Sequence, residues 1–341
     1  MNSKVIKFVA GGGKTTLSEE ILHENNNGLY LAFTNSVVED INNKGYLSRT
    51  IDALFTSFII PKLISLIPII STGSKLKFVD STILANHLKG VANIKIDEDG
   101  NIYNKSKKLE LNIDTSNEKL HSMTSKENIG FLKYIFAKNE LRLTHELRSN
   151  LSSYLIKNHP DKIIDLLDKR FSLIIIDEAQ DLKDYREKFA ELLYNSKIKL
   201  FILGDDNQNI NGGGTWFENL LATETKNQSF RCPENNCKWI RDNLNIDIFG
   251  NSDVSEFKII NFDEVKKHDD NTRTLLYSLK SGKNKDIIES WKGPKDTIKS
   301  AKGSTIYTDI VIIGTSINSR NYYTAITRTK FNVYSTIVKF K

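Results

Sequence analysis

The stretch of sequence that decides the fold lies near the start of the 341-residue chain and reads Val5-Ile6-Lys7-Phe8-Val9-Ala10-Gly11-Gly12-Gly13-Lys14-Thr15-Thr16. Its apolar beginning predicts a buried strand over Val5–Val9, and the residues after the glycines predict a helix over Thr15–His23. Glycines let the backbone wrap closely around phosphate groups, and the helix start adds N–H donors and a positive dipole end. We therefore expect Lys14 to reach the β- and γ-phosphates of a nucleotide and Thr15 to hold Mg²⁺. The residues expected to bind the nucleotide here are Gly11, Gly12, Gly13, Lys14, Thr15 and Thr16.

The spacing of these glycines departs from the usual phosphate-loop pattern. That pattern has a glycine five residues before the last one, at the position where this chain has Phe8. We therefore expect a loop that is shorter or differently shaped. A glycine turn beside a chance lysine is the alternative interpretation.

A second stretch, Leu173-Ile174-Ile175-Ile176-Asp177-Glu178-Ala179-Gln180-Asp181, argues against that alternative. The apolar residues predict a strand covered on both faces of a parallel sheet. Such sheets bind ligands beyond the carboxyl ends of their strands, which is where the adjacent carboxylates follow. Asp177 is expected to hold Mg²⁺, and Glu178 is expected to polarise an attacking water as general base. A solvated acidic loop is the competing interpretation.

The rest of the chain predicts an α/β protein in two parts. Strands are expected near 5–9, 29–33, 173–176 and 199–203 in the first part, and near 257–260, 274–277, 309–313 and 333–337 in the second. Residues from about 75 to 169 differ in character and are expected to form a small inserted subdomain. We predict a first domain at 1–225, which contains this insertion, and a second domain at 226–341.

Composition limits the function only weakly. Hydrophobic residues are 39% and charged residues 26%, so an ordered globular chain is expected rather than a disordered one. The net charge of +6 fits a polyanionic partner, although many lysine-rich proteins bind nothing acidic. The apolar run Ile59–Ile70 contains prolines and falls short of the roughly 20 residues of a membrane span, so no membrane partner is expected. Cys232 and Cys237 lack a neighbouring pair that would complete a zinc site, and we expect reduced thiols in a cytoplasmic protein.

The two motifs resemble those of superfamily 1 helicases of the UvrD/Rep type, and further blocks similar to that family follow in order. These blocks are Ala32-Phe33-Thr34-Asn35-Ser36, Thr50-Ile51-Asp52-Ala53-Leu54-Phe55, Leu203-Gly204-Asp205-Asp206-Asn207-Gln208, Ser229-Phe230-Arg231-Cys232-Pro233, Thr297-Ile298-Lys299-Ser300-Ala301-Lys302-Gly303-Ser304-Thr305 and Tyr322-Tyr323-Thr324-Ala325-Ile326-Thr327-Arg328-Thr329-Lys330. Any single block could arise by chance, but the ordered series covers nearly the whole chain. The resemblance implies two RecA-like parallel-sheet domains with an ATP site at their interface.

The resemblance also implies roles for individual residues. Gln208 would sense the γ-phosphate, Arg231 would contact it, and Arg328 would be the arginine finger. Phe230 would stack on the base of ATP, and Gly303 lies in the block that couples nucleotide to strand. The expected catalytic residues are Lys14, Glu178, Gln208, Arg231 and Arg328, with ATP and Mg²⁺ as cofactors. The residues expected to contact nucleic acid are Phe33, Thr34, Asn35, Thr50, Trp216 and Thr297.

The chain departs from the family at several positions. Only 13 residues precede Lys14, and none is the Gln that reads adenine in the family, which leaves adenine selectivity open. Asp52 stands where a His is common. Thr305 stands where a Glu is frequent, and this departure leaves the direction of travel open. Trp216 would stack on a base from a shifted position, a contact worth roughly 1–3 kcal/mol. A core tryptophan is an equally good interpretation.

We therefore expect an ATP-dependent helicase or translocase that moves on single-stranded nucleic acid, with DNA favoured over RNA. The segment 232–296 is too short for the large insertion of UvrD-type enzymes, so we expect translocation or a protein partner to matter more than unwinding by the chain alone. One alternative is a P-loop ATPase that switches a protein complex without gripping a strand. Another is a binding module that no longer hydrolyses ATP, which the intact set of expected catalytic residues argues against.

Overall fold

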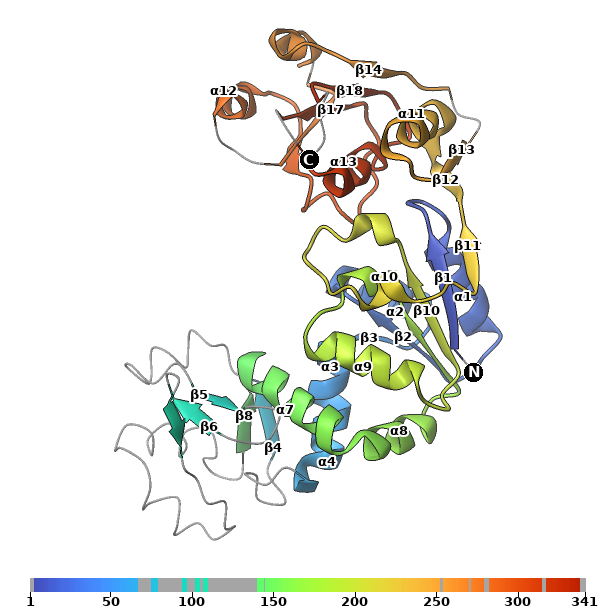
Figure 1. The fold of residues 1–341 in the computed structure, drawn as a ribbon, viewed down its shortest axis with the longest axis vertical. Helices are drawn as coiled ribbons and strands as arrows, with labels where there is room; N and C mark the ends of the chain where they lie inside the picture. Colours follow the sequence, from blue (N-terminus) through green and yellow to red (C-terminus); the bar gives the residue numbers. More distant parts are fainter. Residues whose placement is uncertain are drawn as a thin grey trace. The chain divides into compact units, whose positions relative to one another are not determined.

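The computed structural model describes residues 3–66, 75–78, 94–96, 102–104, 107–109, 140–143, 145–251, 254–269, 271–278, 282–314 and 317–337. These residues have an α/β fold with two parallel sheets, one of six strands and one of five (Figure 1). The expected fold class, α/β with two parallel sheets, is confirmed.

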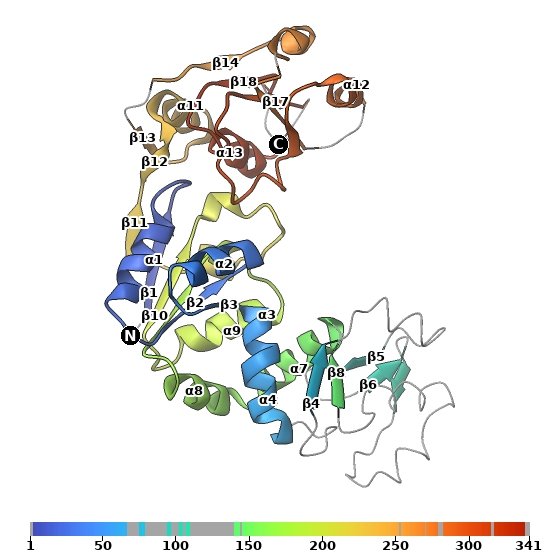
Figure 2. The same ribbon diagram turned by 180° about the vertical axis from the view of Figure 1, so that it is seen from behind.

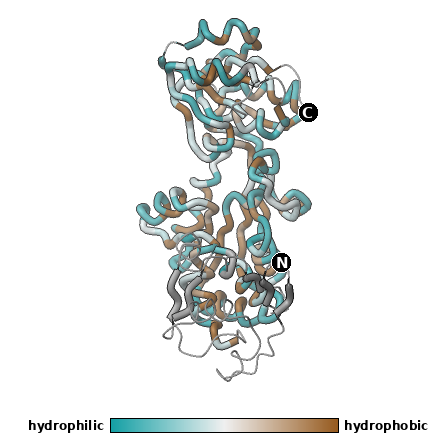
Figure 3. The backbone as a smooth tube through the Cα atoms, turned by 90° about the vertical axis from the view of Figure 1, so that its left-hand side faces the viewer, coloured by the Kyte–Doolittle hydropathy of each residue, from teal (hydrophilic) through white to brown (hydrophobic). Residues whose placement is uncertain are grey.

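The six-stranded sheet has the strand order β11-β1-β10-β9-β2-β3. Its strands are β1 (Ser3–Phe8), β2 (Gly28–Ala32), β3 (Ser48–Thr50), β9 (Leu173–Ile176), β10 (Leu200–Gly204) and β11 (Glu224–Lys226). All side chains of β2, β9 and β10 are buried, as expected for strands covered on both faces. The tube coloured by hydropathy shows brown, apolar stretches in the interior and teal, hydrophilic stretches around them (Figure 3).

The chain divides into two compact units. Unit 1 comprises Met1–Ser3, Asn25–Ile174 and Lys183–Leu200, and unit 2 comprises Lys4–Glu24, Ile175–Leu182 and Phe201–Lys341. Unit 2 therefore holds the glycine loop, the carboxylates that follow β9 and the whole five-stranded sheet. The domains predicted from the sequence, 1–225 and 226–341, correspond to the two large sheets and not to these two units. These domain limits stay a prediction.

Unit 1 is rich in short helices. They are α2 (Asn35–Asn43), α3 (Ile51–Leu54), the π-helical turn η1 (Phe55–Ile59), α4 (Ile60–Leu63), the 3₁₀ turn η2 (Ile64–Leu66), α7 (His145–Asn158), α8 (Pro160–Asp168) and α9 (Tyr185–Tyr194). Phe55 packs edge-on against Tyr185 and Phe189 of α9, and this contact joins η1 to α9. The apolar run that begins at Ile59 continues past η2 into residues outside the described ranges.

Much of the predicted insertion at 75–169 lies outside the described residues, but its described strands do not join the six-stranded sheet. Strand β4 (Lys75–Phe78) pairs in parallel with β8 (Glu140–Leu143), next to α7 (Figure 2). Strands β5 (Ile94–Ile96), β6 (Ile102–Asn104) and β7 (Lys107–Leu109) form a separate antiparallel sheet. The inserted subdomain itself stays a prediction.

Asp52 is the centre of an ionic network in unit 1. Its Oδ1 accepts hydrogen bonds from the Tyr185 hydroxyl at 2.5 Å and from Arg186 Nε at 2.6 Å, and its Oδ2 accepts one from Arg148 Nη2 at 2.5 Å. Burial alone would raise the pKa of Asp52, but the hydrogen bonds and charges of these partners lower it. One carboxylate thus joins α3 to α7 and α9, although its partners lie 96 to 134 residues away in the sequence.

Asp52→Asn is expected to lower the free energy of unfolding by about 1–3 kcal/mol at neutral pH, because it leaves the buried Arg148 beside a neutral amide. Urea denaturation measures this change. Since the folded-state pKa lies below the unfolded one, the stabilisation is present above the unfolded pKa of about 4 and is lost as pH falls through the folded value. The matched control is Asp168→Asn, which removes an exposed ion pair with Lys197 and should have no measurable effect. Equal stabilities of the two variants would contradict the assignment.

The five-stranded sheet of unit 2 has the order β14-β18-β17-β15-β16. Its strands are β14 (Phe257–Ile259), β15 (Thr274–Tyr277), β16 (Lys295–Thr297), β17 (Ile310–Ile313) and β18 (Val333–Ser335). Alternate residues of β17 belong to two different core clusters, Ile310 and Ile312 to one and Val311 and Ile313 to the other. Because successive side chains point to opposite faces of a sheet, both faces are covered.

Helices lie on both faces of this sheet. Residues of α11 (Glu234–Leu244) and α13 (Ser319–Ile326) share the cluster of Ile310, and residues of α12 (Lys283–Ser290) and the turn η7 (Phe262–His268) share the cluster of Val311. Strands β12 (Gln228–Pro233) and β13 (Phe249–Asn251) pair separately from both large sheets. The remaining elements of unit 2 are α1 (Lys14–His23), η5 (Ala179–Asp181), η6 (Asp206–Gln208) and α10 (Trp216–Asn219). Among all described residues, no helix combines the length and the apolar character that a membrane span requires.

Candidate active site

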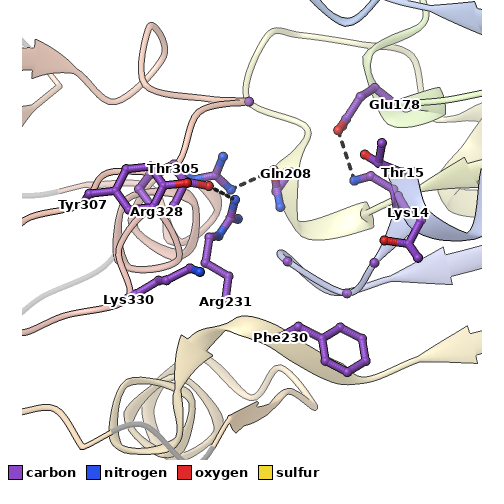
Figure 4. A pocket seen from close by; sticks show the side chains of 15 residues that line it. Lys14, Thr15, Glu178, Gln208, Phe230, Arg231, Thr305, Tyr307, Arg328 and Lys330 are labelled. Carbon is purple, nitrogen blue, oxygen red and sulfur yellow. Dashed lines mark hydrogen bonds and ion pairs between the residues drawn. The ribbon is translucent and has the colours of Figure 1, made fainter. Parts of the chain in front are cut away.

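Unit 2 contains a cavity of about 420 Å³ at the glycine loop (Figure 4). Its lining residues are Gly11, Gly12, Gly13, Lys14, Thr15, Thr16, Glu178, Gln208, Phe230, Arg231, Gly303, Thr305, Tyr307, Arg328 and Lys330. The cavity therefore brings together the expected catalytic residues and the residues expected to bind nucleotide. Figure 4 shows Arg231, Arg328 and Lys330 on the opposite side of the pocket from Lys14 and Glu178.

The glycine loop needs glycine at two positions. Gly13 has a φ of +87° and Gly11 a φ of +71°, in the left-handed region that favours glycine. A Cβ atom on Gly11 would also lie 2.7 Å from Arg231 Cβ, so the loop and β12 approach too closely for a side chain. The loop is further held to β12 by hydrogen bonds from Ser229 Oγ to Ala10 O at 2.7 Å and from the Phe230 N–H to Gly11 O at 2.9 Å.

Lys14 and Glu178 form an ion pair in which Lys14 Nζ lies 3.1 Å from Glu178 Oε1. Burial alone would raise the pKa of Glu178, but the charges of Lys14 and Lys302 and a hydrogen bond from Gln180 lower it to about 2. The pKa of Lys14 is shifted by the same kinds of cause. Burial alone would lower it, but the negative charges of Glu178, Asp177 and Asp205 raise it overall. Both side chains are therefore charged at neutral pH, and each compensates the other.

Asp177 is buried beside the pocket, with 5% of its surface exposed. Its Oδ1 accepts a hydrogen bond from the N–H of Glu178 at 2.8 Å. Mg²⁺ in phosphate sites is bound through one or two carboxylates plus waters and substrate oxygens, so one buried carboxylate and the hydroxyl of Thr15 at the start of α1 fit this ion. No cluster of three or more His, Cys, Asp or Glu side chains suited to a metal occurs in the described ranges.

Two arginines share the side of the pocket opposite Lys14. Arg328 is 2% exposed, and its Nη2 donates to Gln208 Oε1 at 3.2 Å while its Nε donates to Thr324 O at 3.0 Å. Burial lowers the pKa of Arg328, and the like charge of Arg231 lowers it further. Arg231 Nε is buried without a hydrogen-bond partner among the described residues. A buried and a half-buried like charge, together with an unused donor, are the features that a bound polyanion would compensate, so the residues fit a nucleoside triphosphate.

The residues expected to contact nucleic acid are not among those that line the cavity. Thr34 and Asn35 are exposed at the start of α2 in unit 1, next to the half-buried Phe33. Thr50 caps α3 by accepting a hydrogen bond from the Ala53 N–H at 3.0 Å, and Thr297 accepts one from the Ser300 N–H at 3.1 Å. Trp216 is half-buried at the start of α10 in unit 2. Their roles toward a strand stay predictions.

Several residues at the site are not among those that the sequence predicts to bind a ligand. Thr305, Tyr307 and Lys330 line the cavity, and Lys330 Nζ lies 5.9 Å from the centre of the Tyr307 ring. Lys302 forms a buried ion pair with Asp181 at 2.6 Å and donates to Gln208 O at 2.5 Å. The family blocks contain Thr305, Lys302 and Lys330, but only the folded chain shows which of their side chains reach the pocket.

A glycine loop between a strand and a helix, with adjacent carboxylates after another strand of the same parallel sheet, defines the class of P-loop nucleoside triphosphatases. Residues 82–212 match the model of the UvrD/REP helicase N-terminal domain. This match supports the resemblance to UvrD/Rep-type helicases over that part of the chain. The match includes Asp177, Glu178 and Gln208, while the glycine loop and the residues after 212 lie outside it.

Solved structures similar to this chain include helicases of PRRSV and of an arterivirus. The helicase of PRRSV is 11% identical, with a TM-score of 0.47, and the match covers 98% of this chain and 52% of that one. The arterivirus nonstructural protein 10 helicase is 13% identical, with a TM-score of 0.47 and coverage of 98% and 59%. The same kind of helicase in complex with DNA is 13% identical, with a TM-score of 0.46 and coverage of 98% and 60%. The chain thus spans between half and three fifths of the length of these proteins. No curated protein matches the sequence.

Proposed function

We propose that the chain is an ATP-dependent nucleic-acid motor, a helicase or translocase that hydrolyses ATP in the cavity of unit 2 while it moves on single-stranded DNA or RNA. The observation that carries the proposal is the charge of the cavity lining, where Glu178 faces four cations. These cations are Lys14, Arg231, Arg328 and Lys330. A triphosphate is the ligand whose charge such a lining compensates best.

Each residue has a distinct task in this proposal. The backbone N–H groups of the glycine loop and Lys14 would bind the β- and γ-phosphates, and Thr15 and Asp177 would hold Mg²⁺, which neutralises phosphate charge when bound. Glu178 would accept the proton of the attacking water, and Gln208 would contact the γ-phosphate. Arg231 and Arg328 would stabilise the negative charge of the transition state. The exposed ring of Phe230, beside Gly13, would stack on the nucleotide base.

The strand-binding part of the proposal rests on the sequence. The block around Thr34 and Asn35 and the chain's net charge of +6 both suit a phosphate backbone. In this proposal the predicted domains 1–225 and 226–341 close on ATP and open after hydrolysis, which would move the surfaces that grip the strand. A protein partner and a cytoplasmic location are further parts of the prediction; Cys232 and Cys237 are both free thiols.

The test is the ATPase rate of the purified chain with and without oligo(dT). A motor is expected to show at least a 10-fold stimulation, because strand binding completes the arrangement that hydrolyses ATP. The control is Glu178→Gln, which should remain inactive in both conditions and so excludes a contaminating ATPase.

The alternative function, an ATPase that switches a protein complex, predicts a different result. Hydrolysis would then be the same with oligo(dT) and without it, and an RNA oligomer such as oligo(U) would not stimulate it either. That outcome would contradict the motor and favour the switch.

A further inference from the structure

Helix α13 carries two adjacent tyrosines, Tyr322 and Tyr323, whose rings are both fully buried. Their hydroxyl groups have different surroundings. The Tyr322 hydroxyl donates to Ser335 Oγ at 2.5 Å, within the sheet that α13 covers. The Tyr323 hydroxyl accepts a hydrogen bond from the Ala10 N–H at 2.8 Å and donates to Asp205 Oδ2 at 3.0 Å. Tyr323 therefore joins the start of the glycine loop to the end of β10.

Asp205 in turn fixes the orientation of Gln208. Asp205 Oδ2 accepts a hydrogen bond from Gln208 Nε2 at 2.8 Å, and Asp205 Oδ1 accepts one from the Asn207 N–H at 3.0 Å. A carboxylate can only accept hydrogen bonds, so it selects the NH₂ end of the Gln208 amide. The carbonyl end of the amide is then left to face Arg328, whose Nη2 donates to it at 3.2 Å.

These contacts close into a ring. Arg328 follows the C-terminal end of α13, and its Nε donates to Thr324 O at 3.0 Å on the same helix that carries Tyr323. The segment formed by α13 and the residues directly after it thus contacts Gln208 twice, directly through Arg328 and indirectly through Tyr323 and Asp205. All members of the ring are buried, so a lost hydrogen bond cannot be replaced by bulk water.

We propose that Tyr323 is a positioning residue for ATP hydrolysis, whose hydroxyl holds the glycine loop and Asp205 in register so that Gln208 and Arg328 face the γ-phosphate together. Tyr323 acts through other residues and does not line the cavity. The inference rests on the proposed function, because it assigns Tyr323 to the hydrolysis reaction of the same site. Neither the family match at 82–212 nor the sequence motifs assign this task to it.

The test compares Tyr323→Phe with Tyr322→Phe in the full chain. Each variant keeps a buried aromatic ring and removes one hydroxyl from the same helix. Tyr323→Phe removes two hydrogen bonds and Tyr322→Phe removes one, so the thermal stability of both variants is measured beside their activity. Tyr323→Phe alone should lower kcat for ATP, by about 10- to 100-fold, because a small displacement of a positioned group has effects of this order. KM for ATP and the affinity for the fluorescent analogue mant-ATP should stay within about threefold, since Lys14 and the glycine loop still bind the phosphates.

Two further measurements separate positioning from general stability. The effect of Tyr323→Phe on kcat should largely disappear in a Gln208→Ala background, because both changes remove one shared contribution. The acid limb of the pH–rate profile should also move to higher pH. Burial raises the pKa of Asp205. The charge of Lys14 and the hydrogen bonds from Asn207, Gln208 and Tyr323 oppose that rise, so loss of the Tyr323 hydroxyl makes the carboxylate protonate at higher pH.

If Tyr323→Phe does not fold, Asp205→Asn interrupts the same contacts from the other side and should lower kcat to a similar extent. Equal kcat values for Tyr323→Phe and Tyr322→Phe, or full additivity with Gln208→Ala, would overturn the inference alone. A wild-type chain that hydrolyses no ATP, with or without oligo(dT), would overturn the inference and the proposed function together.

Discussion

Arg328→Ala is expected to reduce the ATP turnover of the chain by about 10³-fold or more while leaving its affinity for nucleotide within a few-fold. Arg328 is buried in the cavity wall, where its Nη2 bonds Gln208 Oε1, and water cannot substitute for its charge. The guanidinium is needed most when negative charge develops on the γ-phosphate, so its loss affects kcat more than binding. Steady-state kinetics with oligo(dT) and mant-ATP titration measure the two quantities separately.

The matched control for this prediction is Arg320→Ala. Arg320 lies on α13, eight residues before Arg328, and makes a two-pronged ion pair with Glu218 at 2.8 and 2.9 Å. It does not line the cavity, so its removal should leave turnover within a few-fold of the wild-type rate. Arg328→Lys adds a second comparison, because it keeps the charge and loses the planar fork of donors. If Arg328→Ala and Arg320→Ala reduced turnover equally, Arg328 would not be an arginine finger.

The buried parallel strands were the part of the fold that sequence reasoning predicted best. The limits of β9 and β15 agree with the predicted ranges 173–176 and 274–277, since runs of apolar residues between polar loops leave few alternatives. Strand β11 could not be found in this way. Its side chains are mostly exposed, and it is a strand because its backbone pairs with β1 at the sheet edge.

In the candidate site, too, local motifs could be predicted from the sequence, whereas contacts between residues far apart in the chain could not. Residues of the glycine loop and the carboxylates after β9 form local motifs, and their place in the cavity follows from the elements that carry them. Which of Tyr322 and Tyr323 approaches the site could not be decided from sequence, because adjacent helical residues differ only in the neighbours that tertiary packing supplies. The hydrogen bond between Tyr323 and Asp205 joins residues 118 positions apart. Tyr307 likewise reaches the cavity without belonging to any recognised motif.

Glu178→Gln is expected to retain ATP binding and to lower hydrolysis by about 10²- to 10⁴-fold, the usual contribution of a general base. The amide keeps the shape of the side chain but cannot accept the proton of the attacking water. The change also removes the negative partner that lies 3.1 Å from Lys14 Nζ, so Lys14 becomes free to pair with phosphate. Affinity for mant-ATP should therefore be unchanged or higher, whereas loss of a merely structural ion pair would weaken binding and hydrolysis together.

The control for Glu178→Gln is Glu218→Gln. This change removes an ion-paired glutamate of unit 2 that does not line the cavity, and the variant should hydrolyse ATP at a rate close to the wild type.

The assignment of Glu178 as general base has a further consequence for the pH dependence of hydrolysis. In the free chain Lys14 and the other nearby groups hold the pKa of Glu178 at about 2, too low for an efficient base near neutral pH. Once Lys14 turns to the phosphates, the pKa of Glu178 should rise, because burial then acts with less opposition. The acid limb of kcat should accordingly lie at higher pH than that of kcat/KM. Hydrolysis by Glu178→Gln within 10-fold of the wild-type rate would show that another group accepts the proton.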